Sequence, residues 1–178
     1  TVLRFDVHGA LPASFGADMF VRPHGMFIDR EGNVWVTDGR AAQPDELAAA
    51  PDVAAKGNQV VKFSPEGDVL LVIGTPGHDG RASRGADDRH DRPCATDILI
   101  SEGHAVEGPH GRISRFAADG TFLGTIGEFG TGLGQFRVPH AMAFDSQGWL
   151  FVADRGNSRS RSSTRTTTSR RNGRSSDG

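Results

Sequence analysis

Two histidines stand at matching places in this sequence, each directly after a proline. His24 lies in "VRPHGMFID" and His140 lies in "RVPHAMAFD", 116 residues further along the chain. Neutral imidazole is a preferred ligand of Zn²⁺, and a catalytic zinc centre takes three protein ligands and leaves a fourth position for substrate. A lone histidine after proline is more often a loop residue that hydrogen-bonds the backbone. The repetition of the histidine is therefore what favours a metal site.

The two histidines belong to a sequence repeat. Residues 22–40 return as residues 138–156, and residues 58–74 match residues 111–127 at a shift of 53. The opening residues 1–16 resemble the end of one more unit. Each unit predicts four short antiparallel strands joined by turns that contain glycine. We therefore expect an all-β fold, a β-propeller of four-stranded antiparallel blades, with solenoids or sandwiches as the alternatives.

Two segments break the repeat. In residues 81–103 the spacing from Pro93 to Glu102 is 9 positions, against 15 in both good copies, which indicates a damaged or shortened blade. Residues 156–178 are rich in Ser, Arg and Thr and hold no large apolar side chain, so we expect a disordered tail. Loss of the reading frame and an Arg/Ser-rich RNA-binding tail are the two explanations of this tail. Residues 1–155 are then a partial propeller of about three blades, whereas complete propellers have about four to eight.

Charge separates an acidic body from a basic tail. The chain has a formal charge of -2, but its last 23 residues carry six arginines and one aspartate, which leaves -7 for the body. An acidic body argues against a nucleic-acid partner for the folded part. No apolar run approaches the about 18 residues of a membrane helix, so we expect no membrane partner, and the N-terminus shows no signal-peptide pattern. The open edges of an incomplete ring favour association between chains.

The motifs around the histidines resemble a known family. "NVWVTD" and "LFVADRGNSR" look like NHL repeats. "VRPHGMFIDREGNVWVTD" and "GQFRVPHAMAFDSQGWLFVADRGNSR" resemble the peptidyl-α-hydroxyglycine α-amidating lyases (peptidylamidoglycolate lyases), over residues 1–159 apart from the damaged middle. The resemblance implies a six-bladed propeller with a central zinc ion held by three histidines. It implies cleavage of a peptidyl-α-hydroxyglycine into a peptide amide and glyoxylate, and it favours an extracellular or secretory location.

Carried over by motif, the resemblance implies roles for individual residues. His24 and His140 would be zinc ligands, and the backbone carbonyl of Met26 would help to hold a structural calcium ion. Arg155 in "ADRGN" would hold the substrate carboxylate, for which a guanidinium offers a two-pronged fork. The catalytic base of the family is a tyrosine, but this chain has no tyrosine, and His104 stands in the corresponding stretch. His104 is either the base or a solvated loop histidine. The third zinc histidine would lie where the repeat is lost.

Three functions follow as hypotheses. The first is part of a zinc-dependent, lyase-like NHL propeller for a small peptide-like substrate, with this chain inactive by itself because two histidines hold the metal weakly. The second is a non-catalytic NHL propeller that serves as a protein-binding scaffold, which the missing tyrosine favours. The third is a calcium-dependent, lactonase-like propeller hydrolase, although the acidic cluster for its metal is not evident. We interpret Asp29, Asp38, Asp145 and Asp154 as residues that fix turns through side-chain-to-backbone hydrogen bonds.

Overall fold

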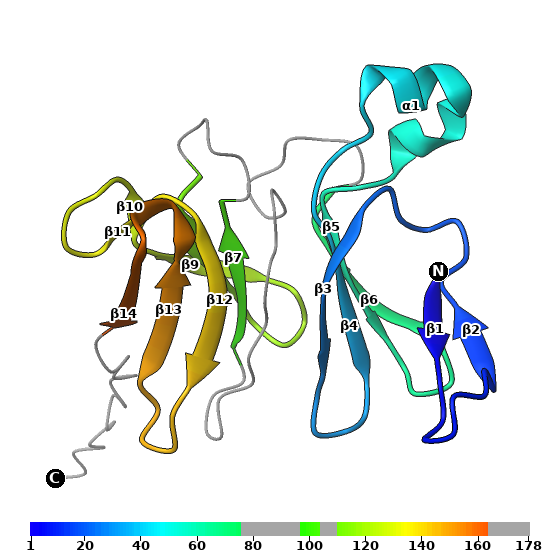
Figure 1. The fold of residues 1–178 in the computed structure, drawn as a ribbon, viewed down its shortest axis with the longest axis horizontal. Helices are drawn as coiled ribbons and strands as arrows, with labels where there is room; N and C mark the ends of the chain where they lie inside the picture. Colours follow the sequence, from blue (N-terminus) through cyan, green and yellow to red (C-terminus); the bar gives the residue numbers. More distant parts are fainter. Residues whose placement is uncertain (76–96, 104–109, 164–178) are drawn as a thin grey trace, which may run out of the picture.

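Short strands are the main secondary structure in the computed structural model, which describes residues 1–75, 97–103 and 110–163 (Figure 1). The strands are β1 (Val2–Arg4), β2 (Ala13–Phe15), β3 (Pro23–Ile28), β4 (Val34–Asp38), β5 (Gln59–Phe63), β6 (Val69–Ile73), β7 (Ile98–Glu102), β8 (Arg112–Phe116), β9 (Phe122–Ile126), β10 (Glu128–Phe129), β11 (Gln135–Phe136), β12 (Pro139–Phe144), β13 (Leu150–Asp154) and β14 (Arg159–Ser163). The helical segments are α1 (Pro44–Ala49), η1 (Pro51–Ala55) and η2 (Arg155–Asn157).

Three antiparallel sheets follow one another along the chain. β3–β4–β5–β6 form a four-stranded sheet, and β7–β8–β9 and β12–β13–β14 form three-stranded sheets. The β1–β2 hairpin and a short parallel pair of β10 and β11 complete the described structure. In Figure 1 the three larger sheets stand side by side, with β1–β2 at one end and β12–β14 at the other. The predicted all-β fold of antiparallel sheets is confirmed, while the number of blades in a complete ring stays a prediction.

One strand at an equivalent repeat position in each larger sheet carries apolar side chains on both faces. β4 reads "VWVTD", β7 reads "ILISE" and β13 reads "LFVAD". Successive side chains of a strand point to opposite faces, so each of these strands supplies apolar contacts to both of its sides. Tight turns precede β4 and β13, where Gly32 and Gly148 have φ of 83° and 82°. Glycine adopts this left-handed backbone without the steric penalty of a side chain.

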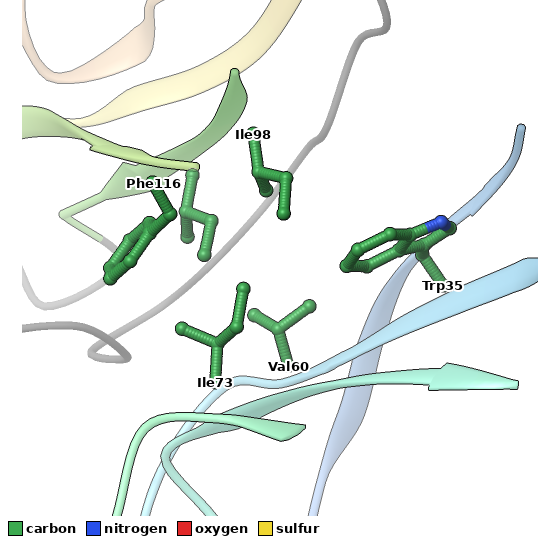
Figure 2. Close-up of a cluster of buried hydrophobic side chains, with 6 residues drawn as sticks. Trp35, Val60, Ile73, Ile98 and Phe116 are labelled. Carbon is green, nitrogen blue, oxygen red and sulfur yellow. The ribbon is translucent and has the colours of Figure 1, made fainter. Parts of the chain in front are cut away.

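Apolar side chains pack between neighbouring sheets. The interface of the β3–β6 and β7–β9 sheets is lined by Trp35, Val60, Ile73, Ile98, Ile100 and Phe116 (Figure 2). The interface of the β7–β9 and β12–β14 sheets is lined by Leu99, Ile113, Met142, Leu150 and Val152. Alternate residues of β7 thus contact the sheet before it and the sheet after it. This is the packing of stacked blades, in which each unit buries its faces against its neighbours.

A short helical insertion between β4 and β5 is absent from the repeat pattern. It comprises α1 and η1 and begins with Pro44 at the first helical position. The Glu46 carboxylate accepts hydrogen bonds from the Gln43 backbone N–H at 2.7 Å and from the Arg40 guanidinium at 2.6 and 2.7 Å. These contacts tie the start of the helix to the end of β4. Among the described residues, no helix is long and apolar enough to cross a membrane.

The start of the predicted tail differs from the expectation of disorder. Within residues 156–178, strand β14 pairs antiparallel with β13, from Arg159 opposite Asp154 to Ser163 opposite Leu150. Backbone hydrogen bonds to an open strand edge do not depend on side-chain type, so a Ser/Arg segment is able to extend the sheet. Residues 164–178, and residues 81–96 of the predicted shortened blade, lie outside the described residues.

Candidate metal centre

His24 and His140 lie side by side in the structure. Their ring centroids are 6.0 Å apart, and the ring planes are inclined by 76°. His24 is exposed in β3 and His140 is half-buried in β12. Because the two strands belong to different sheets, the stacking of the sheets brings these imidazoles together.

Each histidine lies in a β-bulge at the start of its strand. Between the Pro23 and Met26 pairs, the register advances three residues on β3 and two on β4. Between the Pro139 and Ala141 pairs, it advances two residues on β12 and one on β13, so His140 is the extra residue. A bulge adds one residue, bends the strand and re-aims a side chain, and it is over-represented next to active sites. The same device therefore presents both imidazoles.

Buried aspartates hold the loops that precede the histidines. The Asp38 carboxylate accepts hydrogen bonds from the two N–H groups of residues 21–22, at 2.8 and 2.6 Å. Asp154, its repeat equivalent, accepts hydrogen bonds from the two N–H groups of residues 137–138, at 3.1 and 3.0 Å. Burial raises the pKa of Asp38, and its backbone hydrogen bonds act against that rise. Both aspartates thus have the structural role that the sequence analysis gave them.

Asp29 and Asp145 fix the hairpin turns at the other ends of the same strands. Asp29 accepts hydrogen bonds from the Asn33 backbone N–H at 2.8 Å and from the Trp35 indole N–H at 2.9 Å. Asp145 accepts hydrogen bonds from two N–H groups of residues 147–149, at 2.9 and 2.8 Å. Burial alone would raise the pKa of Asp29, but the hydrogen bonds from Trp35 and Asn33 outweigh it and hold this pKa at about 2. The structural interpretation is confirmed for this pair too.

Arg155 directly follows Asp154 and begins η2. Its backbone N–H donates a hydrogen bond to the Val138 carbonyl at 2.9 Å, so Arg155 is tied to the loop that leads into His140. Gly39 makes the equivalent bond in the first blade at 3.0 Å. The side chain of Arg155 is exposed. The structure therefore gives the predicted substrate-binding arginine a fixed backbone position close to the histidine strand.

The other two predicted site residues have less structural support. Met26 pairs with Val36 in the β3–β4 ladder, and its side chain is exposed. His104, the candidate base, lies outside the described residues. Within the described ranges, no group of three or more His, Cys, Asp or Glu side chains is placed to hold a metal ion. The histidine pair is therefore at most two ligands of a larger set.

The separation of the two imidazoles is close to that expected for two ligands of one zinc ion. Zinc–nitrogen bonds of about 2.0–2.1 Å at a tetrahedral angle would place two imidazole centroids about 5 Å apart. The observed separation of 6.0 Å exceeds this value by about one ångström, so binding of one zinc ion by both imidazoles would require a small change of their side-chain torsions.

Glu102 is a buried residue whose partners the sequence did not reveal. It stands at the end of β7, where the neighbouring blades have Asp38 and Asp154. Its carboxylate accepts hydrogen bonds from the Arg112 guanidinium at 2.6 Å and from the Ser114 hydroxyl. Burial raises the pKa of Glu102, and both hydrogen bonds oppose that rise. The register of β7 and β8, which sets Glu102 opposite Arg112, is the feature that creates this contact.

The stacked antiparallel sheets and the repeated strand starts define the class of fold as all-β and propeller-like. No protein-family profile matches the chain. The chain is 34% identical over 146 residues to "NHL repeat-containing protein 3" of Homo sapiens, which covers 77% of this chain and 38% of the relative. It is 34% identical over 171 residues to "Peptidyl-glycine alpha-amidating monooxygenase" of Mus musculus, which covers 89% of this chain and 15% of the relative.

A third relative carries the lyase name itself. The chain is 32% identical over 155 residues to "Peptidyl-alpha-hydroxyglycine alpha-amidating lyase 2" of Drosophila melanogaster, which covers 85% of this chain and 33% of the relative. The chain is thus homologous to NHL-repeat proteins and resembles the amidating lyases, as the motifs predicted. It spans 38% or less of the length of these three curated relatives.

Solved structures support the fold. The chain aligns with virginiamycin B lyase from Staphylococcus aureus at a TM-score of 0.54 and 14% identity, which covers 83% of this chain and 40% of that one. It aligns with a gluconolactonase from Xanthomonas campestris at a TM-score of 0.54 and 17% identity, which covers 85% and 48%. At these identities the likeness shows a propeller-like fold alone.

Proposed function

We propose that this chain supplies two zinc ligands, His24 and His140, to a lyase-like NHL propeller. That propeller would cleave a peptidyl-α-hydroxyglycine to a peptide amide and glyoxylate. The main observation in support of this proposal is the pair of imidazoles, whose centroids lie 6.0 Å apart although the residues come from different sheets. The relatives named as amidating enzymes support the substrate class, and the activity of a complete ring is part of the proposal.

The residues of this chain divide the work of the proposed site. His24 and His140 would hold the zinc ion, which when bound would act as a Lewis acid on the substrate hydroxyl and ease loss of its proton. Arg155 would bind the substrate carboxylate through charge-assisted hydrogen bonds and fix its orientation. His104 stands as the candidate base, and the Met26 carbonyl as a ligand of a structural calcium ion. Both of these roles rest on the resemblance, as does an extracellular or secretory location.

Peptide binding to the zinc-loaded chain tests the proposal. A peptide that ends in α-hydroxyglycine should bind more tightly than the corresponding peptide amide, because only the former offers a carboxylate. Arg155→Ala should weaken binding of the α-hydroxyglycine peptide about tenfold or more, through loss of a charge-assisted contact. Arg30→Ala is the matched control, since Arg30 is exposed on the turn at the other end of β3. Equal binding of both peptides to the wild type would overturn the proposal.

We expect this chain by itself to release no glyoxylate from the peptide. It contains no tyrosine to serve as the base of the family, and its described residues provide two zinc-binding imidazoles. Glyoxylate is measured directly in a discontinuous assay with and without zinc. Zinc-dependent release by the isolated chain would contradict this expectation.

A non-catalytic NHL propeller that binds a protein partner is the second proposal. It is supported by the lack of tyrosine and by the identity to NHL repeat-containing protein 3. This alternative would be favoured if His24 and His140 bound no zinc. A calcium-dependent, lactonase-like hydrolase has less support, because the likeness to the gluconolactonase is one of fold and the described residues contain no acidic metal cluster.

A further inference from the structure

Thr37 lies on β4 opposite the bulge that carries His24. Between the two residue pairs that flank this bulge, β4 contributes Thr37 alone, whereas β3 contributes His24 and Gly25. Thr37 is 4% exposed, so its hydroxyl is shielded from solvent. A bulge interrupts the ladder of backbone hydrogen bonds, and buried backbone groups at the interruption need other partners.

The Thr37 hydroxyl supplies these partners to Gly25. It accepts a hydrogen bond from the Gly25 backbone N–H at 2.8 Å and donates one to the Gly25 carbonyl at 3.4 Å. A single side chain therefore bridges both polar backbone groups of the residue directly after His24. This bridge replaces the ladder bonds that the bulge removes.

The last blade lacks this bridge. At the shift of 116 residues, Ala153 corresponds to Thr37 and Ala141 corresponds to Gly25. Ala141 and Ala153 form a regular pair of the β12–β13 ladder, whereas Gly25 and Thr37 are not paired in the β3–β4 ladder. The hydroxyl thus occurs in the blade where backbone pairing is interrupted at this position, and alanine occurs in the blade where pairing continues.

The surroundings of Thr37 offer no substitute for its hydroxyl. Thr37 and Gly25 line a small cavity between the first two larger sheets. The other side chains that line this cavity are aliphatic or aromatic, and they are those of Met26, Phe27, Trp35, Val60 and Ile100. Loss of the hydroxyl would leave the Gly25 N–H without its acceptor, which favours a shift of the bulge.

The backbone just after Thr37 lies close to the base of the His24 side chain. A side-chain carbon placed on Gly39 would lie 3.5 Å from the His24 Cβ. The Gly39 N–H donates a hydrogen bond at 3.0 Å to the carbonyl of Arg22, two residues before His24. Contacts with the end of β4 therefore hold the chain on both sides of His24, so a shift of the bulge would move the imidazole.

We propose that Thr37 is a positioning residue for His24. Its hydroxyl fixes the bulge so that the His24 imidazole lies 6.0 Å from that of His140. The inference rests on the proposed function, because it concerns the orientation of one proposed zinc ligand. Residues that orient metal ligands contribute about 10–100-fold to metal affinity.

Two substitutions of Thr37 separate its hydroxyl from its shape. Thr37→Val removes the hydroxyl and keeps the branched side chain, whereas Thr37→Ser keeps the hydroxyl. In calorimetric titrations, Thr37→Val should weaken zinc binding about tenfold or more, and Thr37→Ser should bind zinc within about threefold of the wild type. Wild-type affinity in Thr37→Val, or an equal loss in both variants, would overturn the proposal.

Ser64→Ala is the matched control for a lost hydroxyl. The Ser64 hydroxyl accepts hydrogen bonds from the backbone N–H groups of residues 66 and 68, at 3.2 Å each. Ser64 follows β5 at the end of the sheet opposite to His24, since Phe63 pairs with Val34 at the start of β4. Its loss should leave zinc affinity within about threefold of the wild type, and a loss equal to that of Thr37→Val would show a general effect of stability.

Nuclear magnetic resonance of the metal-free chain tests the position of His24 without zinc. In the wild type and Thr37→Ser, a nuclear Overhauser effect should connect the ring protons of His24 and His140. In Thr37→Val this contact should disappear, and the Gly25 N–H should exchange with solvent about tenfold faster. If the wild type binds no zinc but these changes occur, the proposed function fails and the positioning role stands. If Thr37→Val keeps the ring contact, the positioning role is wrong even when the wild type binds zinc.

Discussion

At the residue scale, the hydrogen-bond donors around a buried carboxylate determine whether its pKa is lowered or raised. Asp29 and Asp38 are both buried, yet the pKa of Asp29 lies at about 2 and that of Asp38 is raised. Burial raises the pKa of both carboxyl groups, but Asp29 also accepts side-chain hydrogen bonds from Trp35 and Asn33. Lys62 adds an ion pair to Asp29 at 3.2 Å. Asp29 therefore stabilises the fold as an anion, while Asp38 acts mainly as an anchor for the loop before His24.

Asp29→Asn should lower the free energy of unfolding by about 1–2 kcal/mol at neutral pH. The folded pKa of about 2 lies below the ordinary value of 3.8, so the carboxylate favours the folded state whenever it is ionised. This contribution is complete above about pH 5 and is lost as the pH falls through about 4 toward 2. Urea unfolding across this range measures it, with exposed Asp68→Asn as the control. An Asp29→Asn protein with the full acid sensitivity of the wild type would contradict the assignment.

At the element scale, a bulge and an aspartate clamp form one repeated unit. The unit occurs at the start of β3 and again at the start of β12, and each time it carries a histidine. The bulge presents the imidazole, and the clamp fixes the loop that enters the strand. The strand positions of the two imidazoles are therefore fixed by the backbone geometry of the fold.

Asp154→Ala should weaken zinc binding about 10–100-fold, because residues that orient metal ligands contribute this much to affinity. It should also lower the free energy of unfolding by about 1–3 kcal/mol, since two buried N–H groups lose their acceptor. Asp145→Ala is the matched control at the other end of the same strands. The control should lower stability and leave zinc affinity within about threefold. An equal loss of zinc affinity in both variants would show that Asp154 acts only on the fold.

The sequence predicted the elements that recur and missed those that do not. Comparison of the two copies predicted the hairpins around Gly32 and Gly148 and the equivalence of His24 with His140. Within the described ranges, helix α1 has no counterpart in another blade, so comparison of the repeats did not predict it, although Pro44 and the acidic residues after it are a helix-start signal. The bulges were not predicted, because a one-residue change of register is decided by strand pairing.

Contacts between strands could not be predicted from the sequence either. The partners of Glu102 depend on the register of β7 against β8, which sets Arg112 opposite and brings Ser114 within reach. The closeness of His24 and His140 depends on the stacking of three sheets. The repeat predicted that both side chains would converge, and the separation of 6.0 Å needed the packed molecule.

At the scale of the whole molecule, stability resides in the interfaces between sheets. Ile100 of β7 packs with Trp35 and Val60 of the preceding sheet, whereas Leu99 on the other face packs with Met142 and the sheet that follows. A single strand thus couples three sheets. We expect the described sheets to unfold together as one cooperative unit.

Ile100→Ala should lower the free energy of unfolding by about 2–4 kcal/mol, from lost burial and the cavity that remains. Leu70→Ala in β6 is the control, because Leu70 is 52% exposed, and its effect should stay within about 0.5 kcal/mol. Urea unfolding followed by circular dichroism and by tryptophan fluorescence measures both. Two separate transitions in the wild type would contradict the coupling of the sheets.

The central claim is that His24 and His140 bind one zinc ion together. Calorimetric titration of zinc into the wild type, His24→Ala, His140→Ala and the double variant tests it most directly, with exposed His8→Ala as the control. Each single substitution should weaken zinc binding about tenfold or more, and the double variant should lose little beyond either one, because both substitutions remove ligands of the same ion. Equal zinc binding by the wild type and His24→Ala would contradict the claim.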